Sequence, residues 1–229
     1  PMVRNNMTRA NLVIAESQYE LDLLRKNFDM EGELFYKGFT FPKYDTANKI
    51  LQVLWVGRSV DLKRPDMFIA LAQRMPQIHF IMVCPKADEI CYRNTEHAAL
   101  ECGNLEFFES IPRKELLKIF SETRVVVNTS TTEAVVNTLV EAIEYDAAFV
   151  SLKIDAGGLL GDIEDSTCIG LCAGDDFKLF CEYVELMLTQ KQLAREFIFR
   201  GKKYAHEHWS IAEYARKHDE AIKRLVNQA

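Results

Sequence analysis

Two glutamates separated by seven residues, Glu133 and Glu141, have the spacing in this chain that best suits ligand chemistry. They follow the β-branched run Val125–Val127, and Glu141 lies in an apolar segment with helical periodicity. Open α/β sheets bind ligands where a buried strand ends in a polar loop and leads into a helix. Ionised carboxylates only accept hydrogen bonds, so the pair suits the hydroxyl groups of a ribose or a hexose. The N–H groups at the start of such a helix suit phosphate.

The same residues also fit a structural interpretation. Ser130-x-x-Glu133 has the pattern of a capping box, in which the serine begins a helix and the glutamate bonds back to it. Glu141 would then be a solvated carboxylate on that helix. The two interpretations differ in where the helix begins.

A second cluster, Gly57, Arg58 and Lys63, follows the apolar run Ile50–Val56. Glycine lets the backbone turn sharply and approach a ligand. Two cations at the end of a strand suit a diphosphate when no metal supplies positive charge. The chain has no Walker loop, no G-x-G-x-x-G and no Asp-x-Asp pair for a divalent ion. The alternative is that both cations belong to an ordinary surface loop.

The apolar pattern predicts the sheet that would bring these clusters together. Strands are predicted at Ile50–Val56, His79–Cys84, Leu105–Phe108, Arg124–Asn128, Ala147–Leu152 and Thr167–Leu171. Amphipathic helices are predicted at Met67–Met75, Arg113–Phe120, Val136–Tyr145 and Asp176–Leu188. This alternation predicts an α/β fold, with a Rossmann-like parallel sheet and helices on both faces.

Three parts of the chain are predicted: residues 1–45, residues 46–208 and residues 209–229. The first contains short strands at Asn11–Ala15 and Leu34–Tyr36, a helix at Ser17–Asn27 and a linker at Thr40–Thr46, and it is too small for a core of its own. The last is an amphipathic helix that begins with the capping box Ser210-x-x-Glu213. His218 lies on its apolar stripe, so we interpret it as a histidine at the edge of a core rather than a ligand.

Composition excludes several classes of protein. The 34 acidic and 28 basic residues give a net charge of −6, which disfavours nucleic-acid binding. No apolar run reaches the roughly 18 residues of a membrane span, and no signal peptide opens the chain. The six cysteines form no C-x-x-C pair, so we expect reduced thiols, no zinc site and a cytoplasmic location.

From about Lys49 to His208 the chain resembles the C-terminal, donor-binding domain of glycosyltransferase family 4 enzymes, which have the GT-B fold. The resemblance lies in the order and spacing of its segments: Val56-Gly57-Arg58, Lys63–Phe68, Phe80–Val83, Asn104–Phe107, Ile111–Leu116, Val127–Ser130 with Glu133 and Glu141, Gly157-Gly158 and Gly170-Leu171. Upstream, Asn11–Ser17 and Leu34–Gly38 resemble the tail end of the family's N-terminal, acceptor-side domain.

The resemblance implies a retaining, metal-independent hexosyltransferase with no cofactor and a UDP- or GDP-sugar as co-substrate. It implies that Arg58 and Lys63 hold the donor diphosphate and that Glu133 contacts the donor sugar, these three forming the catalytic group. It implies that Glu141 binds the ribose. The remaining donor-binding positions that it implies are Gly57, Ser110 and Ile111 around the nucleotide, and the backbone of Val136, Asn137 and Thr138 at the phosphate.

The resemblance also implies that the acceptor site belongs to a missing N-terminal domain or a partner subunit. The chain as given would then be inactive alone. It could cover its apolar surface by forming a homo-oligomer, and the whole protein could reach a membrane surface through the absent domain. Three alternatives stay open: a nucleotide-sugar epimerase or phosphorylase of the same architecture, a non-catalytic nucleotide-binding module, and a doubly wound domain with another ligand. Nucleotide binding separates the first two from the third, and turnover separates an enzyme from a module.

Overall fold

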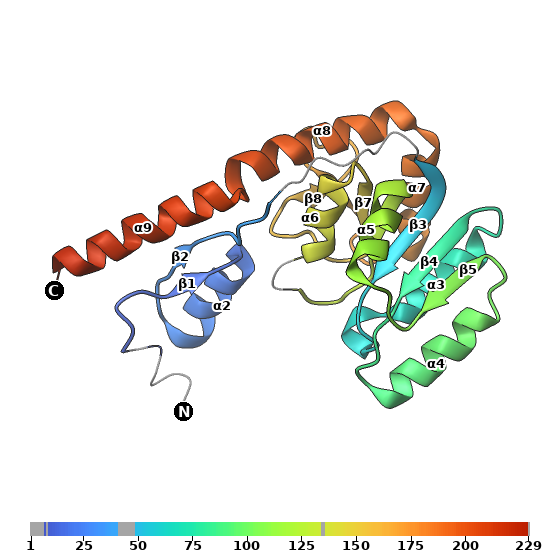
Figure 1. Cartoon of the computed structure of the whole chain (residues 1–229), viewed down its shortest axis with the longest axis horizontal. Coiled ribbons are helices and arrows are strands. Elements are labelled where there is room, and N and C mark those ends of the chain that lie inside the picture. Colours follow the sequence, from blue (N-terminus) through green and yellow to red (C-terminus); the bar gives the residue numbers. More distant parts are fainter. Residues whose placement is uncertain (1–6, 8, 41–48, 134–135, 229) are drawn as a thin grey trace. The chain divides into compact units, whose positions relative to one another are not determined.

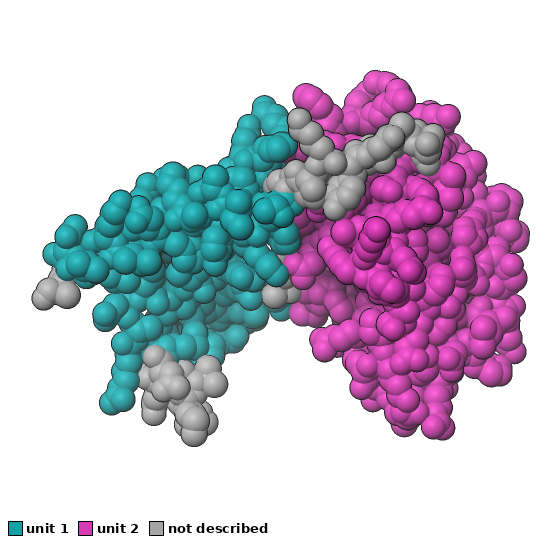
Figure 2. All heavy atoms as spheres, viewed as in Figure 1, with its two compact units in different colours: residues 1–42, 203–229 teal, residues 43–202 magenta. Residues whose placement is uncertain are grey.

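The computed structural model describes residues 7, 9–40, 49–133 and 136–228, and the chain divides into two compact units (Figure 1, Figure 2). Residues 43–202 form the larger unit, and residues 1–42 together with 203–229 form the smaller one. The main domain predicted from the sequence ended at residue 208, but residues 203–208 belong to the smaller unit. The predicted linker Thr40–Thr46 lies outside the described residues except for Thr40.

The larger unit contains a seven-stranded sheet in the order β5-β4-β3-β6-β7-β9-β8, in which neighbouring strands pair in parallel. The predicted parallel α/β sheet is therefore confirmed. Six of the strands lie within three residues of the predicted bounds, and β8 was not predicted. The strands are β3 (Ile50–Val56), β4 (His79–Val83), β5 (Leu105–Phe108), β6 (Thr123–Asn128), β7 (Ala148–Ser151), β8 (Leu160–Gly161) and β9 (Gly170–Cys172).

The strand order reverses between β3 and β6. The chain runs from β3 outward through β4 to β5, and then returns to the other side of β3 for β6 and β7. At such a switch point the loops after the two central strands diverge and leave a crevice at the carboxyl end of the sheet. Residues 57–63 follow β3 and residues 129–133 follow β6, so both clusters singled out in the sequence border this crevice.

Helices cover both faces of the sheet, as predicted (Figure 1). They are α3 (Pro65–Arg74), α4 (Glu89–Leu100), α5 (Arg113–Glu122), α6 (Asn137–Glu144), α7 (Phe177–Thr189) and α8 (Lys191–His208). On one face, Trp55 and Met82 pack with Phe68 of α3 and Phe180 of α7 in a single apolar core. On the other face, α5 packs against β3, and α6 packs against β6 and β7. Successive strand residues point to opposite faces, so both layers draw on the same apolar runs.

Asn104 fixes the end of α3. Its Nδ2 group donates to the backbone carbonyls of Ala72, Met75 and Ile78 at 3.0, 3.0 and 2.9 Å. These carbonyls lie at the end of the helix or just after it, where intrahelical partners run out. The amide therefore ties the end of α3 to the turn that enters β4.

The smaller unit contains β1 (Ile14–Ala15), α2 (Gln18–Phe28), β2 (Glu33–Leu34) and α9 (Ile211–Gln228). β1 and β2 pair in parallel, and Ser17 caps α2 by accepting a hydrogen bond from the amide of Glu20 at 3.2 Å. The ring of His218 lies 4.9 Å from that of the buried Phe35, which fits the predicted core-edge histidine. Among the described residues, no helix is long and apolar enough to span a lipid bilayer.

Candidate functional site

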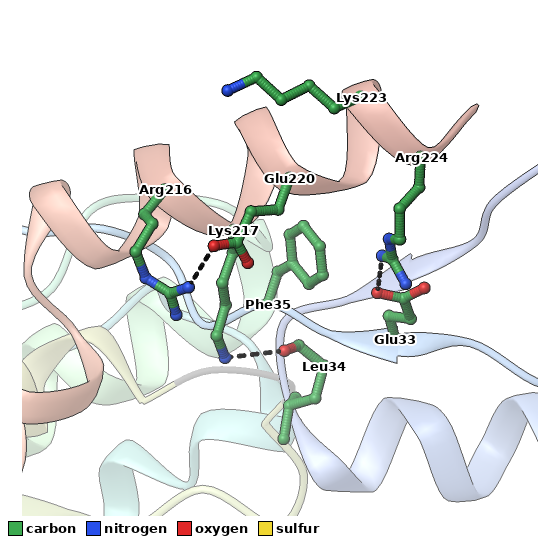
Figure 3. A pocket seen from close by; sticks show the side chains of 8 residues that line it. All are labelled: Glu33, Leu34, Phe35, Arg216, Lys217, Glu220, Lys223 and Arg224. Carbon is green, nitrogen blue, oxygen red and sulfur yellow. Dashed lines mark hydrogen bonds and ion pairs between the residues drawn. The ribbon is translucent and has the colours of Figure 1, made fainter. Parts of the chain in front are cut away.

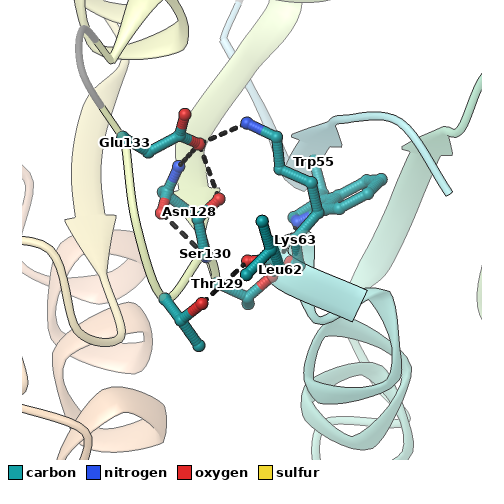
Figure 4. A network of polar contacts seen from close by, with 8 residues as sticks. Trp55, Leu62, Lys63, Asn128, Thr129, Ser130 and Glu133 are labelled. Atoms are coloured by element: carbon teal, nitrogen blue, oxygen red, sulfur yellow. Dashed lines mark hydrogen bonds and ion pairs between the residues drawn. The ribbon is translucent and has the colours of Figure 1, made fainter. Parts of the chain in front are cut away.

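Lys63 and Glu133 form an ion pair in the crevice between the loops after β3 and β6 (Figure 4). The carboxylate oxygen that pairs with Lys63 also accepts hydrogen bonds from the hydroxyl of Ser130 at 2.6 Å and the side-chain amide of Asn128 at 3.3 Å. The two charged side chains are 24% and 13% exposed, so the pair is partly shielded from water. Two residues chosen on sequence grounds therefore share one site.

Hydrogen bonds between the two loops hold Lys63 in place. Lys63 ends a short 3₁₀ helix, η1 (Asp61–Lys63), and its carbonyl accepts a hydrogen bond from the hydroxyl of Thr129 at 2.6 Å. The same hydroxyl accepts the indole N–H of Trp55 at 2.9 Å. The amide of Thr131 donates to the carbonyl of Leu62 at 2.9 Å. This chain of contacts anchors the backbone of Lys63 to the buried strand β3.

Gly57 is needed for a different reason from the one expected. We expected glycine to permit a sharp backbone turn, but Gly57 is not among the residues with positive φ. A Cβ atom at this position would lie 2.8 Å from the indole of Trp55, which is buried. Gly57 therefore makes room for the ring that hydrogen-bonds to Thr129. Arg58, the next residue, is exposed and makes no ion pair with any residue that the structure describes.

Glu141 is held by a cation that the sequence did not single out for a role. Its carboxylate pairs with Arg113, the first residue of α5, at 2.6 Å. The side chain of Glu141 is largely buried, and that of Arg113 is mostly exposed. One turn further along α6, burial and then the charge of Glu141 raise the pKa of Glu144 to about 7. A carboxylate paired with Arg113 therefore lies beside a second carboxyl group that is readily protonated.

The start of α6 is open to an anion. Its N-cap, Val136, provides no side-chain acceptor, and the first turn, which contains Asn137 and Thr138, has no acidic residue. The first N–H groups of a helix lack intrahelical partners and carry the positive end of its dipole. Because α6 begins at Asn137, the capping-box interpretation of Ser130 and Glu133 is wrong. The serine hydroxyl instead donates to the glutamate side chain.

Ser110 and Ile111 lie in the loop between β5 and α5, and within the described part of the chain no hydrogen bond joins them to Lys63, Glu133 or Glu141. β4 separates β5 from β3 in the sheet. Arg113, the first residue of α5 after this loop, does contact a predicted site residue, Glu141. The structure thus brings Lys63 to Glu133 and Arg113 to Glu141, and leaves Ser110 and Ile111 at the margin.

Three further charged residues lie together in loops that follow strands or η1. Asp175, in the loop after β9, pairs with Arg64 after η1 and with Lys153 after β7, the latter at 3.1 Å. The hydrogen bond from Arg64, followed by that from Lys153, holds the pKa of Asp175 below its ordinary value. Asp175 also has a left-handed backbone, with φ of 74°. In the sequence, Lys153 and Asp175 could have been found only from their positions after strands, whereas Arg64 lies in the segment Lys63–Phe68.

The smaller unit has a groove of its own, between β2 and α9 (Figure 3). Most of its cations are paired with carboxylates: Arg224 pairs with Glu33 at 2.6 Å, Arg216 with Glu220 at 2.6 Å and Lys223 with Asp219 at 2.6 Å. Lys217 donates to the carbonyl of Leu34 at 3.4 Å. An ion that entered this groove would have to compete with these existing contacts. Among the described residues, no three His, Cys, Asp or Glu side chains are placed to hold a metal ion.

Known proteins resemble this chain in sequence and in fold. No family model matches the sequence. The chain is 22% identical over 191 residues to "Glycosyltransferase 1 domain-containing protein 1" of Xenopus tropicalis, an alignment that covers 81% of this chain and 52% of that protein. The chain therefore spans about half the length of the curated relative it matches.

Solved glycosyltransferase structures share the architecture. A point mutant of S. aureus TarM, in complex with fondaparinux, α-GlcNAc-glycerol and UDP, matches with a TM-score of 0.77 and 18% identity, over 94% of this chain and 44% of TarM. Anabaena HepE in complex with UDP-glucose matches with a TM-score of 0.79 and 16% identity, over 97% of this chain and 66% of HepE. A glycosyltransferase from Rickettsia africae ESF-5 matches with a TM-score of 0.82 and 12% identity, over 100% of this chain and 68% of that enzyme. This chain has the fold that these glycosyltransferases share.

Proposed function

We propose that this chain is the donor-binding part of a retaining, family 4 glycosyltransferase, which transfers a hexose from a nucleotide-diphospho-sugar. The observation that carries the proposal is the meeting of Lys63 and Glu133 at the point where the strand order reverses. A cation for phosphate and a carboxylate for sugar hydroxyls lie there in one partly shielded network. The structural relatives that contain UDP or UDP-glucose favour a UDP-sugar over a GDP-sugar.

The diphosphate would lie between the loop after β3 and the start of α6. Arg58 is exposed and unpaired among the described residues, Lys63 ends η1, and the amides of Asn137 and Thr138 open the helix. Negative charge grows on the diphosphate as the glycosidic bond breaks. Fixed cations and helix N–H groups stabilise that charge without rearranging. They supply the positive charge that a divalent metal provides elsewhere, so we propose a metal-independent reaction.

The ion pair between Lys63 and Glu133 gives the ligand-free site a resting state. When a diphosphate takes Lys63 as its partner, Glu133 loses a cation and turns to the hydroxyl groups of the hexose. Asn128 and Ser130 continue to orient the carboxylate because they bond to it independently of Lys63. In this role Glu133 positions the sugar and stabilises charge at the reacting carbon, while retention of configuration requires no covalent bond to it.

Glu141 would accept hydrogen bonds from the ribose hydroxyls. Its ion pair with Arg113 fixes the direction of the carboxylate. Gly57, Ser110 and Ile111 would border the nucleotide on the β3 and β5 side of the sheet. In this division of roles Glu133 contacts the hexose of the donor and Glu141 contacts its ribose.

Titration of nucleotides into the purified chain tests the proposal. We expect UDP to bind, and we expect Lys63→Ala to weaken it about 10- to 150-fold, the equivalent of a lost hydrogen bond between charged groups. Lys118→Ala is the matched control, since Lys118 is an exposed lysine on α5 that pairs only weakly with Glu122 at 3.8 Å. EDTA should leave the affinity unchanged. Equal affinity of Lys63→Ala and the unaltered chain for UDP would remove Lys63 from the site.

A further inference from the structure

A pocket of about 520 Å³ lies at the opposite edge of the sheet from the crevice. Three of its lining residues lie at or just before the amino ends of β3, β6 and β7. The crevice, by contrast, lies at the carboxyl ends of the strands. We call this pocket the α8 pocket, because the largest part of its lining comes from that helix. The lining residues are Lys49, Arg124, Asp146, Lys191, Ala194, Arg195, Ile198, Phe199 and Lys202.

The α8 pocket is strongly basic, although the chain as a whole is acidic. Five cations and a single carboxylate line it, in a protein whose net charge is −6. Lys202 forms an ion pair with the carboxylate, Asp146. Asp146 also attracts the charge of Lys49, so a single carboxylate serves two of the five cations and leaves Arg124, Lys191 and Arg195 without one in the lining.

Two of the cations are partly buried and belong to the fold. Lys49 donates to the carbonyls of Phe120 at 3.1 Å and of Tyr145, and Arg124 donates to the carbonyl of Leu188 at 3.0 Å. These carbonyls lie at the ends of α5, α6 and α7, so both side chains cap helices. Carbonyl groups carry only partial charge, and burial lowers the pKa of Lys49 to about 8. The fold thus keeps an ammonium group where water solvates it poorly and an anion would stabilise it.

Two further cations of the pocket lie on one face of α8. Lys191 and Arg195 are exposed, stand one turn apart, and form no ion pair with any residue that the structure describes. Ile198 and Lys202 continue the same helical row, since residues three and four apart are neighbours on a helix surface. Phe199, beside them, is 72% exposed. Neither helix capping nor core packing accounts for Lys191, Arg195 or Phe199.

We infer that the α8 pocket binds a phosphate ester. Lys49 and Arg124 supply partly buried positive charge, and Lys191 and Arg195 supply exposed donors. Ala194, Ile198 and Phe199 give the organic part of the ligand an apolar surface. A soluble metabolite and a phospholipid headgroup are the two sources of such a phosphate. The seven residues of β3 span about 20 Å, so this ligand touches neither Arg58 nor Lys63.

Titration of inorganic pyrophosphate at low ionic strength tests whether the pocket binds a soluble phosphate. The parent chain for this test is Lys63→Ala, because that substitution weakens phosphate binding in the crevice. Adding Lys191→Gln and Arg195→Gln should weaken the affinity at least about tenfold, since two charged donors are lost. Arg74→Gln with Lys178→Gln is the matched control, because it removes the same charge from exposed positions on α3 and α7. The control should stay within about twofold of the parent, because long-range effects of exposed charges are screened.

The lipid source is tested by sedimentation with phosphatidylcholine vesicles that contain or lack phosphatidylserine. Retention that needs phosphatidylserine, and that is lost both in Lys191→Gln/Arg195→Gln and in Phe199→Ser, assigns the pocket to a phospholipid headgroup. A pyrophosphate response without vesicle binding assigns it to a soluble phosphate ester. If Lys191→Gln/Arg195→Gln matches its parent and the Arg74/Lys178 control in both experiments, the inference is overturned.

Discussion

Replacing Glu133 with glutamine should separate the two halves of the donor. In the ligand-free chain the Glu133 carboxylate neutralises Lys63 and also accepts hydrogen bonds from Ser130 and Asn128. Glutamine has nearly the same shape but carries no charge, so Lys63 becomes free to meet a diphosphate. The hexose, by contrast, loses an ionised acceptor. Glu133→Gln should therefore weaken the affinity for UDP-glucose relative to the affinity for UDP.

The size of both effects follows from burial. Exposed ion pairs contribute about 0–1 kcal/mol and breaking a buried pair costs about 3–5 kcal/mol, so side chains that are 24% and 13% exposed place this pair at about 1–2 kcal/mol. Release of Lys63 should then leave the Kd for UDP unchanged or lower it by up to about 30-fold. The hydrogen bond from the sugar to a charged group is worth about 1.5–3 kcal/mol, so the ratio of Kd for UDP-glucose to Kd for UDP should rise about 10- to 150-fold.

Isothermal titration of both ligands into the unaltered chain and Glu133→Gln measures this ratio. Glu141→Gln should weaken both ligands equally, because both contain the ribose. Glu122→Gln, which removes a carboxylate paired with Lys118 on α5, should change neither. A ratio that stays the same in Glu133→Gln would refute the assignment of Glu133 to the sugar. A loss of UDP affinity as large as that in Glu141→Gln would refute the division of roles.

Three other changes test how the fold supports the site. Asn104→Ala leaves three carbonyls without their donor and should lower the free energy of unfolding by about 2–4 kcal/mol in urea melts, whereas Asn94→Ala on the exposed side of α4 should change it by less than about 0.5 kcal/mol. Gly57→Ala puts a Cβ atom 2.8 Å from the buried indole of Trp55 and should lower both stability and UDP affinity; a variant that binds UDP normally would contradict this. Burial raises the pKa of Glu144 from its ordinary value of 4.5 to about 7, so the folded chain binds that proton more tightly than the unfolded chain. Stability should therefore fall as pH rises from about 4.5 to about 7 in the unaltered chain, and Glu144→Gln should remove that part of the pH dependence.

The sheet could be predicted because its strands are short, β-branched apolar runs buried on both faces. β3, β4 and β6 show this pattern plainly, and the helices between them follow from spacing. α8 was not predicted, because three of the residues that it buries, Ala194, Gly201 and Ala205, are small and only Phe197 among the fully buried ones is large. A Cβ atom at Gly201 would lie 2.9 Å from Ile143, so close helix packing selects the small residue. α4 was missed for a related reason, since the residues that it buries are Tyr92, Thr95 and Ala99.

The positions of the candidate residues after the strands could be predicted, but their contacts could not. Local patterns placed Lys63 and Glu133 after two different strands, yet their pairing depends on β3 and β6 being neighbours in the sheet. The pairing of Arg113 with Glu141 likewise depends on how α5 and α6 pack. The packing of Gly57 against Trp55 was not predicted, because a local pattern does not show which way the indole turns.

A crystal structure of the chain with UDP-glucose tests the central claim most directly. The account predicts that the diphosphate lies within hydrogen-bond distance of Lys63 and the amide of Asn137, with Glu133 turned from Lys63 to the hexose and Glu141 on the ribose. UDP-glucose bound elsewhere, with the ion pair between Lys63 and Glu133 intact, would contradict it.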